Sequence, residues 1–340
     1  MTAFIRTPDD SFAGLADFPY EPHYHPWQDL RMHYVDEGPR DAPVMLLLHG
    51  MPTWAYLYRD MIPHLVGAGY RCIAPDHMGF GRSDKPTDIH WYTIARHTEI
   101  LTTLVTGLDL TDITLVGQDW GGPIGLAQAA TMPERFSRLV IMNTWLHHPG
   151  YGYTDAIRNW NRNWHEGGIF DRPCPDVGLL LVLTADLAPR EVIFPALING
   201  TNPGLTGKAA EVYRGFSAPY AGLPDEAFNG YRRFPLSIPL DSYDNGNAAA
   251  QTFHYRTLLG WEKPAHFIWG CTDEVFPESW GRTWAESMGG TFDPIADAGH
   301  FLQNTHGPEI VDILLRRIAD EGEGLSQSGA AHPGAGPEDR

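Results

Sequence analysis

The sequence predicts an α/β fold in which a mostly parallel sheet is covered by helices, with a further helical segment inserted into it. Three observations lead to this prediction. Continuous apolar runs such as Val44–Leu48 are typical of strands that are buried on both faces. Such runs alternate with helical patterns, as in the helix expected near 94–108, which is the order of a parallel sheet with crossover helices. From about His147 to Asn245 the alternation stops, and proline, glycine and aromatic residues become frequent.

Composition limits the class of protein and its partners. The chain of 340 residues is 43% hydrophobic, which suits a globular protein with a substantial core. It carries 24 Lys and Arg against 42 Asp and Glu, a formal net charge of −18. Nucleic acid and anionic membrane surfaces are therefore not expected as partners, because both need a basic surface. The longest apolar runs are also far too short to span a bilayer.

Cysteine usage and the first residues favour the cytoplasm. Cys72, Cys174 and Cys271 are few, odd in number and widely spaced, as expected of reduced thiols. Residues 1–12 contain Asp9 and Asp10 and no apolar stretch, so we expect no signal peptide.

The predicted elements follow one another in a regular order. Residues 1 to about 43 are expected to contain a hairpin whose clearest strand is Leu30–Val35. Active sites of parallel sheets lie beyond the carboxyl ends of the strands. In this chain, clusters of turn-forming residues follow several of the expected strands. Besides Val44–Leu48 and Ile113–Val116, the expected strands are Arg71–Pro75, Leu139–Asn143, Ala265–Gly270 and Thr291–Ala296, and a helix is expected at Ala248–Leu258.

We expect four segments along the chain. Residues 1–146 and 246–320 form the two parts of the sheet core, and 147–245 forms a helical cap over the strand ends. The last helix is expected at Pro308–Ile318, which has a helical apolar period. Residues 321–340 are expected to be a disordered tail, because they contain too little apolar content to fold.

The central motif is Gly117-Gln118-Asp119-Trp120-Gly121, between an apolar strand and a small-residue helical pattern. It resembles the nucleophile elbow of α/β-hydrolases, usually Gly-x-Ser-x-Gly, with aspartate in place of serine. The elbow points its central side chain at a helix N-terminus, where backbone N–H groups favour negative charge. Asp119 is therefore a candidate carboxylate nucleophile.

Two further residues complete a candidate triad. Asp273 and His300 each follow a predicted strand, and with Asp119 they come in the order nucleophile, acid, histidine. His300 would be the general base, and Asp273 would orient its imidazole. Some relatives place the acid after the strand at Leu139–Asn143, but no carboxylate follows that strand here.

An aspartate nucleophile narrows the reaction. A carboxylate that attacks an sp³ carbon forms an ester, which water can hydrolyse, whereas a serine would leave a stable ether. The substrate is therefore expected to be a haloalkane or an epoxide. The backbone N–H groups of Met51 and Trp120 are expected to stabilise the oxyanion of ester hydrolysis. A leaving halide needs N–H donors, and an indole is a donor that never accepts.

Seven short motifs are characteristic of one known family: Arg6–Asp9, His33–Pro39, Pro52–Trp54, Gly117–Trp120, Ser217–Tyr220, Arg232–Pro235 and Asp297–Phe301. Through them the chain resembles haloalkane dehalogenases of the first subfamily, over nearly its whole length to about Asp320. The resemblance implies an α/β-hydrolase fold with an eight-stranded sheet, an Asp-His-Asp triad and a halide held by two tryptophans. The first matches Trp120 and the second best matches Trp160, with Trp164 as a competitor. The apolar substrate pocket that it implies is lined by Ile157, Phe234, Ile238, Val275 and Phe276.

One departure from that family concerns the residue after His49-Gly50. It is glutamate in most of the subfamily and asparagine in others, but here it is Met51. The backbone donor survives, whereas a polar side chain near the halide is lost.

The expected protein is a monomeric hydrolase of small apolar haloalkanes that needs no cofactor and no metal and releases a halide ion. The first alternative is an epoxide hydrolase, which needs two cap tyrosines that face Asp119 and protonate the epoxide oxygen. A second alternative is a non-catalytic, ligand-binding relative, against which the intact triad argues. The tyrosines available for the epoxide hydrolase alternative are Tyr151, Tyr153, Tyr213 and Tyr220.

Overall fold

The computed structural model describes residues 1–15, 17–166, 174, 176–240 and 247–328, with the backbone alone for 323–328. Its main sheet has eight strands in the order β10-β9-β8-β7-β4-β5-β3-β2. Strands β4, β5 and β7–β10 pair in parallel, whereas β2 pairs antiparallel with β3 and β3 antiparallel with β5. The predicted α/β-hydrolase fold is thereby confirmed. The strands are β2 His23–Trp27, β3 Leu30–Glu37, β4 Val44–Leu48, β5 Arg71–Pro75, β7 Ile113–Gln118, β8 Phe136–Met142, β9 Ala265–Gly270 and β10 Thr291–Ile295.

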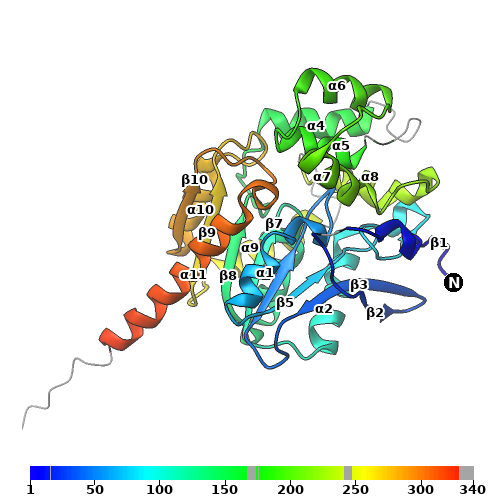
Figure 1. The fold of residues 1–340 in the computed structure, drawn as a ribbon. Coiled ribbons are helices and arrows are strands. Elements are labelled where there is room, and N and C mark those ends of the chain that lie inside the picture. The colour runs from blue at the N-terminus through cyan, green and yellow to red at the C-terminus, as the bar shows by residue number, and fades with distance from the viewer. Residues whose placement is uncertain (16, 167–173, 175, 241–246, 329–340) are drawn as a thin grey trace, which may run out of the picture.

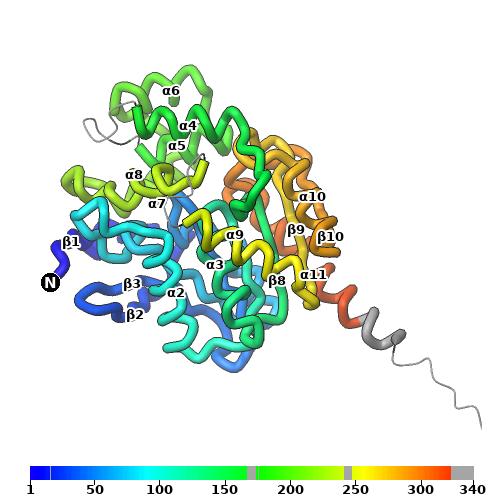
Figure 2. The backbone as a smooth tube through the Cα atoms, turned by 180° about the vertical axis from the view of Figure 1, so that it is seen from behind, coloured from blue at the N-terminus to red at the C-terminus, as the bar shows by residue number. Residues whose placement is uncertain are grey.

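Helices cover both faces of this sheet. Figure 1 shows α1 and α11 in front of the strands, and Figure 2, from behind, shows α2, α3 and α9 over the opposite face. Helix α10 packs on β9 and β10. These helices are α1 Ile62–Gly67, α2 Ile94–Gly107, α3 Gly121–Thr131, α9 Asn247–Leu258, α10 Glu278–Met288 and α11 Leu302–Ser328.

Between β8 and α9 the chain forms a group of helices that lies above one end of the sheet (Figure 1). We call these helices, α4–α8, the cap helices. The division into core and cap at the predicted boundaries stays a prediction. Residues 167–173, 175 and 241–245 of the predicted cap lie outside the described part of the chain. The cap helices are α4 Asp155–Glu166, α5 Val177–Thr184, α6 Arg190–Asn199, α7 Gly207–Ser217 and α8 Asn229–Leu236.

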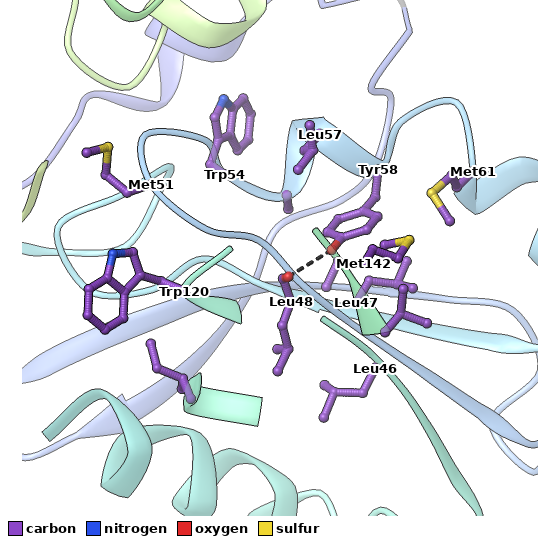
Figure 3. Packing of buried hydrophobic residues seen from close by; sticks show 14 of the residues in the cluster. Leu46, Leu47, Leu48, Met51, Trp54, Leu57, Tyr58, Met61, Trp120 and Met142 are labelled. Atoms are coloured by element: carbon purple, nitrogen blue, oxygen red, sulfur yellow. Dashed lines mark hydrogen bonds between the residues drawn. The ribbon is translucent and has the colours of Figure 1, made fainter. Parts of the chain in front are cut away.

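The apolar runs of the sequence form the centre of the sheet. Every residue of β4, β7 and β9 is buried, as expected of strands that helices cover on both faces. At the end of β4 the hydroxyl of Tyr58 donates a hydrogen bond to the carbonyl of Leu48 at 2.8 Å, which satisfies a buried acceptor (Figure 3). The chain then turns toward Met51, which lies on the same side of Leu48 as Trp120 in that view.

A second, two-stranded sheet joins the N-terminus to the loop after β5. Strand β1, Phe4–Ile5, pairs antiparallel with β6, Lys85–Pro86. The guanidinium of Arg6 extends this contact with paired hydrogen bonds to Asp84 at 2.7 Å.

The expectation of a tail without structure from residue 321 is wrong for 321–328. Helix α11 continues to Ser328, and the carboxylate of Glu321 pairs with Arg138 and with Nε2 of His266 on the sheet. These long-range contacts hold the helix where local composition predicts none. Residues 329–340 lie outside the described part of the chain.

In the part of the chain that the structure describes, no helix is both long and apolar enough to cross a membrane.

Candidate active site

The elbow places Asp119 between β7 and α3 in a left-handed conformation, with φ of 50°. A non-glycine residue rarely adopts this conformation, and surrounding hydrogen bonds must hold it. The N–H of Asp119 donates to the carbonyl of Asn143 at 3.0 Å, and the hydroxyl of Thr144 donates to the carbonyl of Asp119 at 2.6 Å. A Cβ at Gly122 would overlap the Thr144 side chain, so the glycine is required by close approach.

A second loop, after β4, supplies a backbone donor to the nucleophile. The N–H of Met51 donates to Oδ1 of Asp119 at 2.8 Å. A Cβ at Gly50 would overlap the Asp119 carboxylate, which explains glycine before Met51. The predicted second oxyanion donor, the backbone N–H of Trp120, lies at the start of the following helix, and its role stays a prediction.

The structure brings the three predicted catalytic side chains together. Nδ1 of His300 lies 2.8 Å from Oδ2 of Asp273, and Nε2 lies 3.6 Å from Oδ2 of Asp119. The other oxygen of Asp273, Oδ1, accepts the N–H of Val275 at 2.8 Å. The buried carboxylate of Asp273 thus holds one ring nitrogen of His300, and the other ring nitrogen faces the nucleophile.

The two carboxylates decide the protonation of His300. Burial alone lowers its pKa, but the charges and hydrogen bonds of Asp273 and Asp119 outweigh burial and raise the pKa to about 10. In the resting site the imidazole is therefore an imidazolium that both carboxylates stabilise. Its charge depends in part on Asp119 remaining ionised.

Asn143, at the end of β8, is a positioning residue that the sequence analysis noted only for lacking a carboxylate. Its amide donates to Oδ2 of Asp273 at 2.9 Å and to the carbonyl of Gly270 at 3.0 Å. Its amide oxygen accepts the N–H of Gly270 at 2.8 Å. Asn143 therefore joins the ends of β7, β8 and β9 and fixes two members of the triad relative to each other.

An apolar cavity of about 330 Å³ lies beside these residues. The exposed lining residues Trp160, Thr184 and Glu274 indicate where it opens. Its lining residues are Met51, Pro52, Asp119, Trp120, Trp145, Ala156, Ile157, Trp160, Leu180, Thr184, Pro235, Ile238, Glu274, Val275, Phe276, His300 and Phe301.

Of the five predicted pocket residues, Ile157, Ile238, Val275 and Phe276 line the cavity and Phe234 does not. The ring of Phe234 is buried behind the cavity wall, with its centroid 5.2 Å from that of Trp120. The prediction for Phe234 is therefore corrected, because helix α8 presents its neighbour Pro235 to the cavity instead.

The tryptophans considered for halide binding also differ in whether they line the cavity. Trp120 and Trp160 line the cavity, whereas Trp164 is buried against Tyr231 and does not. Trp145, which was not among the predicted residues, also lines the cavity and packs edge-on against Trp120 with ring centroids 4.7 Å apart. Its position just beyond a predicted parallel strand was the available signal.

The four cap tyrosines considered for an epoxide site are all in the described part of the chain, and none lines this cavity. The hydroxyl of Tyr153 lies 2.8 Å from Nδ1 of His147. Tyr213 donates to Asp176 at 3.4 Å, and Tyr220 donates to the carbonyl of Gly79 at 3.1 Å. Tyr151 lies beside a separate cavity.

The described residues do not bring together three histidine, cysteine or carboxylate side chains able to hold a metal.

The chain is similar to known proteins in sequence and in structure. The family model of the α/β hydrolase fold matches residues 43–168. A haloalkane dehalogenase of Psychrobacter cryohalolentis is 37% identical over 329 residues, 93% of this chain and 98% of that protein. Haloalkane dehalogenase 1 of Mycobacterium tuberculosis is 38% identical over 322 residues, 92% of this chain and 97% of that protein. The solved structure of the haloalkane dehalogenase DpaA from Paraglaciecola agarilytica NO2, described as tetrameric, matches with a TM-score of 0.78 at 31% identity over 91% of this chain and 97% of that chain. The chain therefore belongs to the haloalkane dehalogenase family.

Proposed function

We propose that this protein hydrolyses small apolar haloalkanes through a covalent ester on Asp119. The observation that carries the proposal is a carboxylate at the elbow, 3.6 Å from the imidazole of His300, beside an apolar cavity. A carboxylate suits attack on an sp³ carbon, because the ester that forms is still open to water. No cofactor is needed for either step.

In the first step a carboxylate oxygen of Asp119 forms a bond to the carbon that bears the halogen. The carbon–halogen bond breaks, and the halide leaves with the bonding electrons. The negative charge thus passes from Asp119 to the halide, which needs N–H donors in an otherwise apolar cavity. The indole of Trp120 is one such donor, and Trp160 in the same cavity wall is the candidate for the second.

In the second step His300 removes a proton from water, and the oxygen attacks the carbonyl carbon of the ester. The N–H of Met51, already 2.8 Å from Oδ1 of Asp119, is placed to stabilise the resulting oxyanion. The alcohol leaves with the proton that His300 returns, and the regenerated carboxyl group loses its own proton. The net products are alcohol, halide and one proton.

The charge balance of the site links the two steps. Asp119 contributes to the raised pKa of His300, about 10 in the resting site. Once Asp119 is an ester its charge is gone, so the pKa of His300 falls and the imidazole becomes a base. Asp273 keeps its charge and stabilises the imidazolium that forms when water is deprotonated.

The placement of the tyrosines supports haloalkanes over epoxides. An alkoxide leaving group needs a proton donor, and none of the four candidate tyrosines lines the cavity. A halide is a weak base and needs only hydrogen-bond donors, which indoles supply.

The test is the release of halide and alcohol from short bromo- and chloroalkanes, with an epoxide panel run in parallel. Asp119→Ala should abolish halide release, whereas Asp41→Ala, an exposed aspartate outside the cavity, should retain it. Diol from epoxides with no halide from any haloalkane would overturn the proposal. Halide release that survives in Asp119→Ala would overturn the role of the nucleophile.

A further inference from the structure

The opening of the substrate cavity carries a negative charge that the triad does not use. Glu274 lines the cavity and is exposed to solvent, and no described residue forms a hydrogen bond or an ion pair with its carboxylate. Exposed glutamates are ionised at neutral pH. On the basis of the proposed dehalogenation, we infer that Glu274 selects haloalkanes whose far end is positively charged and disfavours haloalkanes that end in an anion.

The backbone that carries Glu274 is held on both the core side and the cap side. The residue before it, Asp273, accepts the N–H of Val275 at 2.8 Å through Oδ1. The carbonyl of Val275 accepts the hydroxyl of Thr154, which directly precedes the cap helix α4, at 3.2 Å. Because Asp273 also binds His300, this loop fixes the starting point of the Glu274 side chain relative to the triad.

No charge among the described lining residues offsets Glu274. The lining there includes neither lysine nor arginine. The imidazolium of His300 already faces two carboxylates, Asp119 and Asp273, which together exceed its charge by one. The whole chain has a formal net charge of −18. The potential at the opening is therefore negative, so it attracts cations and repels anions.

The apolar wall determines where the positive charge of such a substrate must lie. Inside the cavity an ammonium group would lose its hydration without gaining a partner, which is costly. A substrate long enough to span the cavity keeps its ammonium group in water beside Glu274 while the halogenated carbon reaches Asp119. Lysine side chains bury their methylene stems and keep their charged ends in water in the same way. The inferred substrate class is therefore a haloalkane with a terminal ammonium group.

The experiment compares three bromoalkanes of equal chain length that end in trimethylammonium, tert-butyl or carboxylate. The tert-butyl group has the shape of trimethylammonium without its charge. Halide release gives kcat/KM for the wild-type protein, Glu274→Gln and Glu134→Gln, with chains from butyl to octyl and at low and high salt. Glu134→Gln is the matched control, because Glu134 is also an exposed glutamate and lies outside this cavity.

Glu274→Gln should lower kcat/KM for the trimethylammonium substrate, relative to the tert-butyl substrate, by roughly 2- to 5-fold, the range for an exposed ion pair. Relative to the same reference it should raise kcat/KM for the carboxylate substrate by a similar factor. The ratio of the two charged substrates should therefore fall by roughly 4- to 25-fold. The change should appear only with chains long enough to reach the opening and should shrink at high salt.

Glu134→Gln should leave this ratio within about twofold of wild type, because solvent and salt screen a distant surface charge. A role of Glu274 in folding or packing alone would not distinguish substrates by their charge. An unchanged ratio in Glu274→Gln at every chain length would overturn the inference. An equal change in Glu134→Gln would also overturn it, because the effect would then belong to the net charge of the protein.

Failure of the proposed function gives a different result. The wild-type protein would then release no halide even from the uncharged tert-butyl substrates. Halide release from those substrates, with the same ratio of the charged substrates in wild type and Glu274→Gln, would refute the assignment of Glu274 alone.

Discussion

His300 controls the second half of the proposed reaction and is not needed for the first. Attack by the Asp119 carboxylate requires no base, whereas hydrolysis of the ester requires one. His300→Gln should therefore release about one halide per protein molecule and then stop. Intact-mass measurement after reaction with 1-bromobutane should show the added butyl group. Steady turnover in His300→Gln would refute the role of His300 as base, and Asp119→Ala should gain no mass.

The charge of His300 also predicts how stability depends on pH. Its pKa is about 10 when folded, against an ordinary value of 6.5. A group whose folded pKa is raised contributes stability that is complete below pH 6.5 and is lost as the pH rises to about 10. The difference in free energy of unfolding between wild type and His300→Gln should therefore shrink from pH 6.5 to 10. Urea denaturation at several pH values measures it, and a constant difference would contradict the pairing.

At the scale of single residues, sequence reasoning located the reacting groups but not all of their supports. Asp119, Asp273 and His300 carry signals in their motif and chain order. Asn143 and Trp145 carry only their position at or just beyond the end of a predicted strand, because the role of an amide or indole depends on which atoms surround it after folding. Phe234 illustrates the same limit, because its helix turns it toward Trp120 and not toward the cavity.

The positions of the triad residues depend on the loop that follows β8, which begins with Asn143. Asn143→Ala removes the amide bonds to Asp273 and Gly270 and leaves buried polar groups without partners. It should lower the free energy of unfolding by about 2–4 kcal/mol and kcat by at least about tenfold. Asn163→Ala, on an exposed position of α4, should change neither. Urea denaturation and halide release measure both quantities, and full activity in Asn143→Ala would exclude a positioning role.

The turn before Met51 gives a second prediction at the scale of elements. Alanine at Gly50 would place a methyl group into the Asp119 carboxylate, which must then move from the Met51 N–H. Gly50→Ala should reduce kcat/KM by at least about 100-fold, equivalent to about 2.7 kcal/mol. Gly67→Ala, where a methyl group meets open space, is the control. Comparable activities of the two variants would show that the loop and the nucleophile adjust independently.

Strands that are buried on both faces were predictable for a physical reason. A strand buried on both faces must be apolar throughout, so β4 and β9 are found at their predicted residues. Strand β8 begins earlier than predicted, at Phe136, because polar Ser137 and Arg138 interrupt its apolar run. Helix α11 extends past its predicted end because Glu321 reaches Arg138 on that strand, a contact that local composition does not contain.

At the scale of the whole molecule, the N-terminal residues join the sheet core to the cap helices. Buried Thr7 donates to the carbonyl of Pro219, just after α7, at 2.8 Å and accepts from Nζ of Lys85 at 2.8 Å. The amino group of Lys85 also donates to the carbonyls of Gly81 and Ser83 at 2.7 and 3.1 Å. One hydroxyl thus connects three segments that are far apart in the sequence, at a distance from the cavity.

Thr7→Val keeps the shape of this side chain and removes both hydrogen bonds. It leaves a buried carbonyl and one N–H of the buried Lys85 amino group unpaired, so the free energy of unfolding should fall by about 2–4 kcal/mol. Because Thr7 does not line the cavity, kcat/KM should stay within about twofold of wild type. Thr87→Val, which loses an exposed bond of 3.3 Å to the carbonyl of Ala3, should cost less than about 0.5 kcal/mol. Equal stability of the two variants would show that the link through Thr7 does not hold the cap helices to the core.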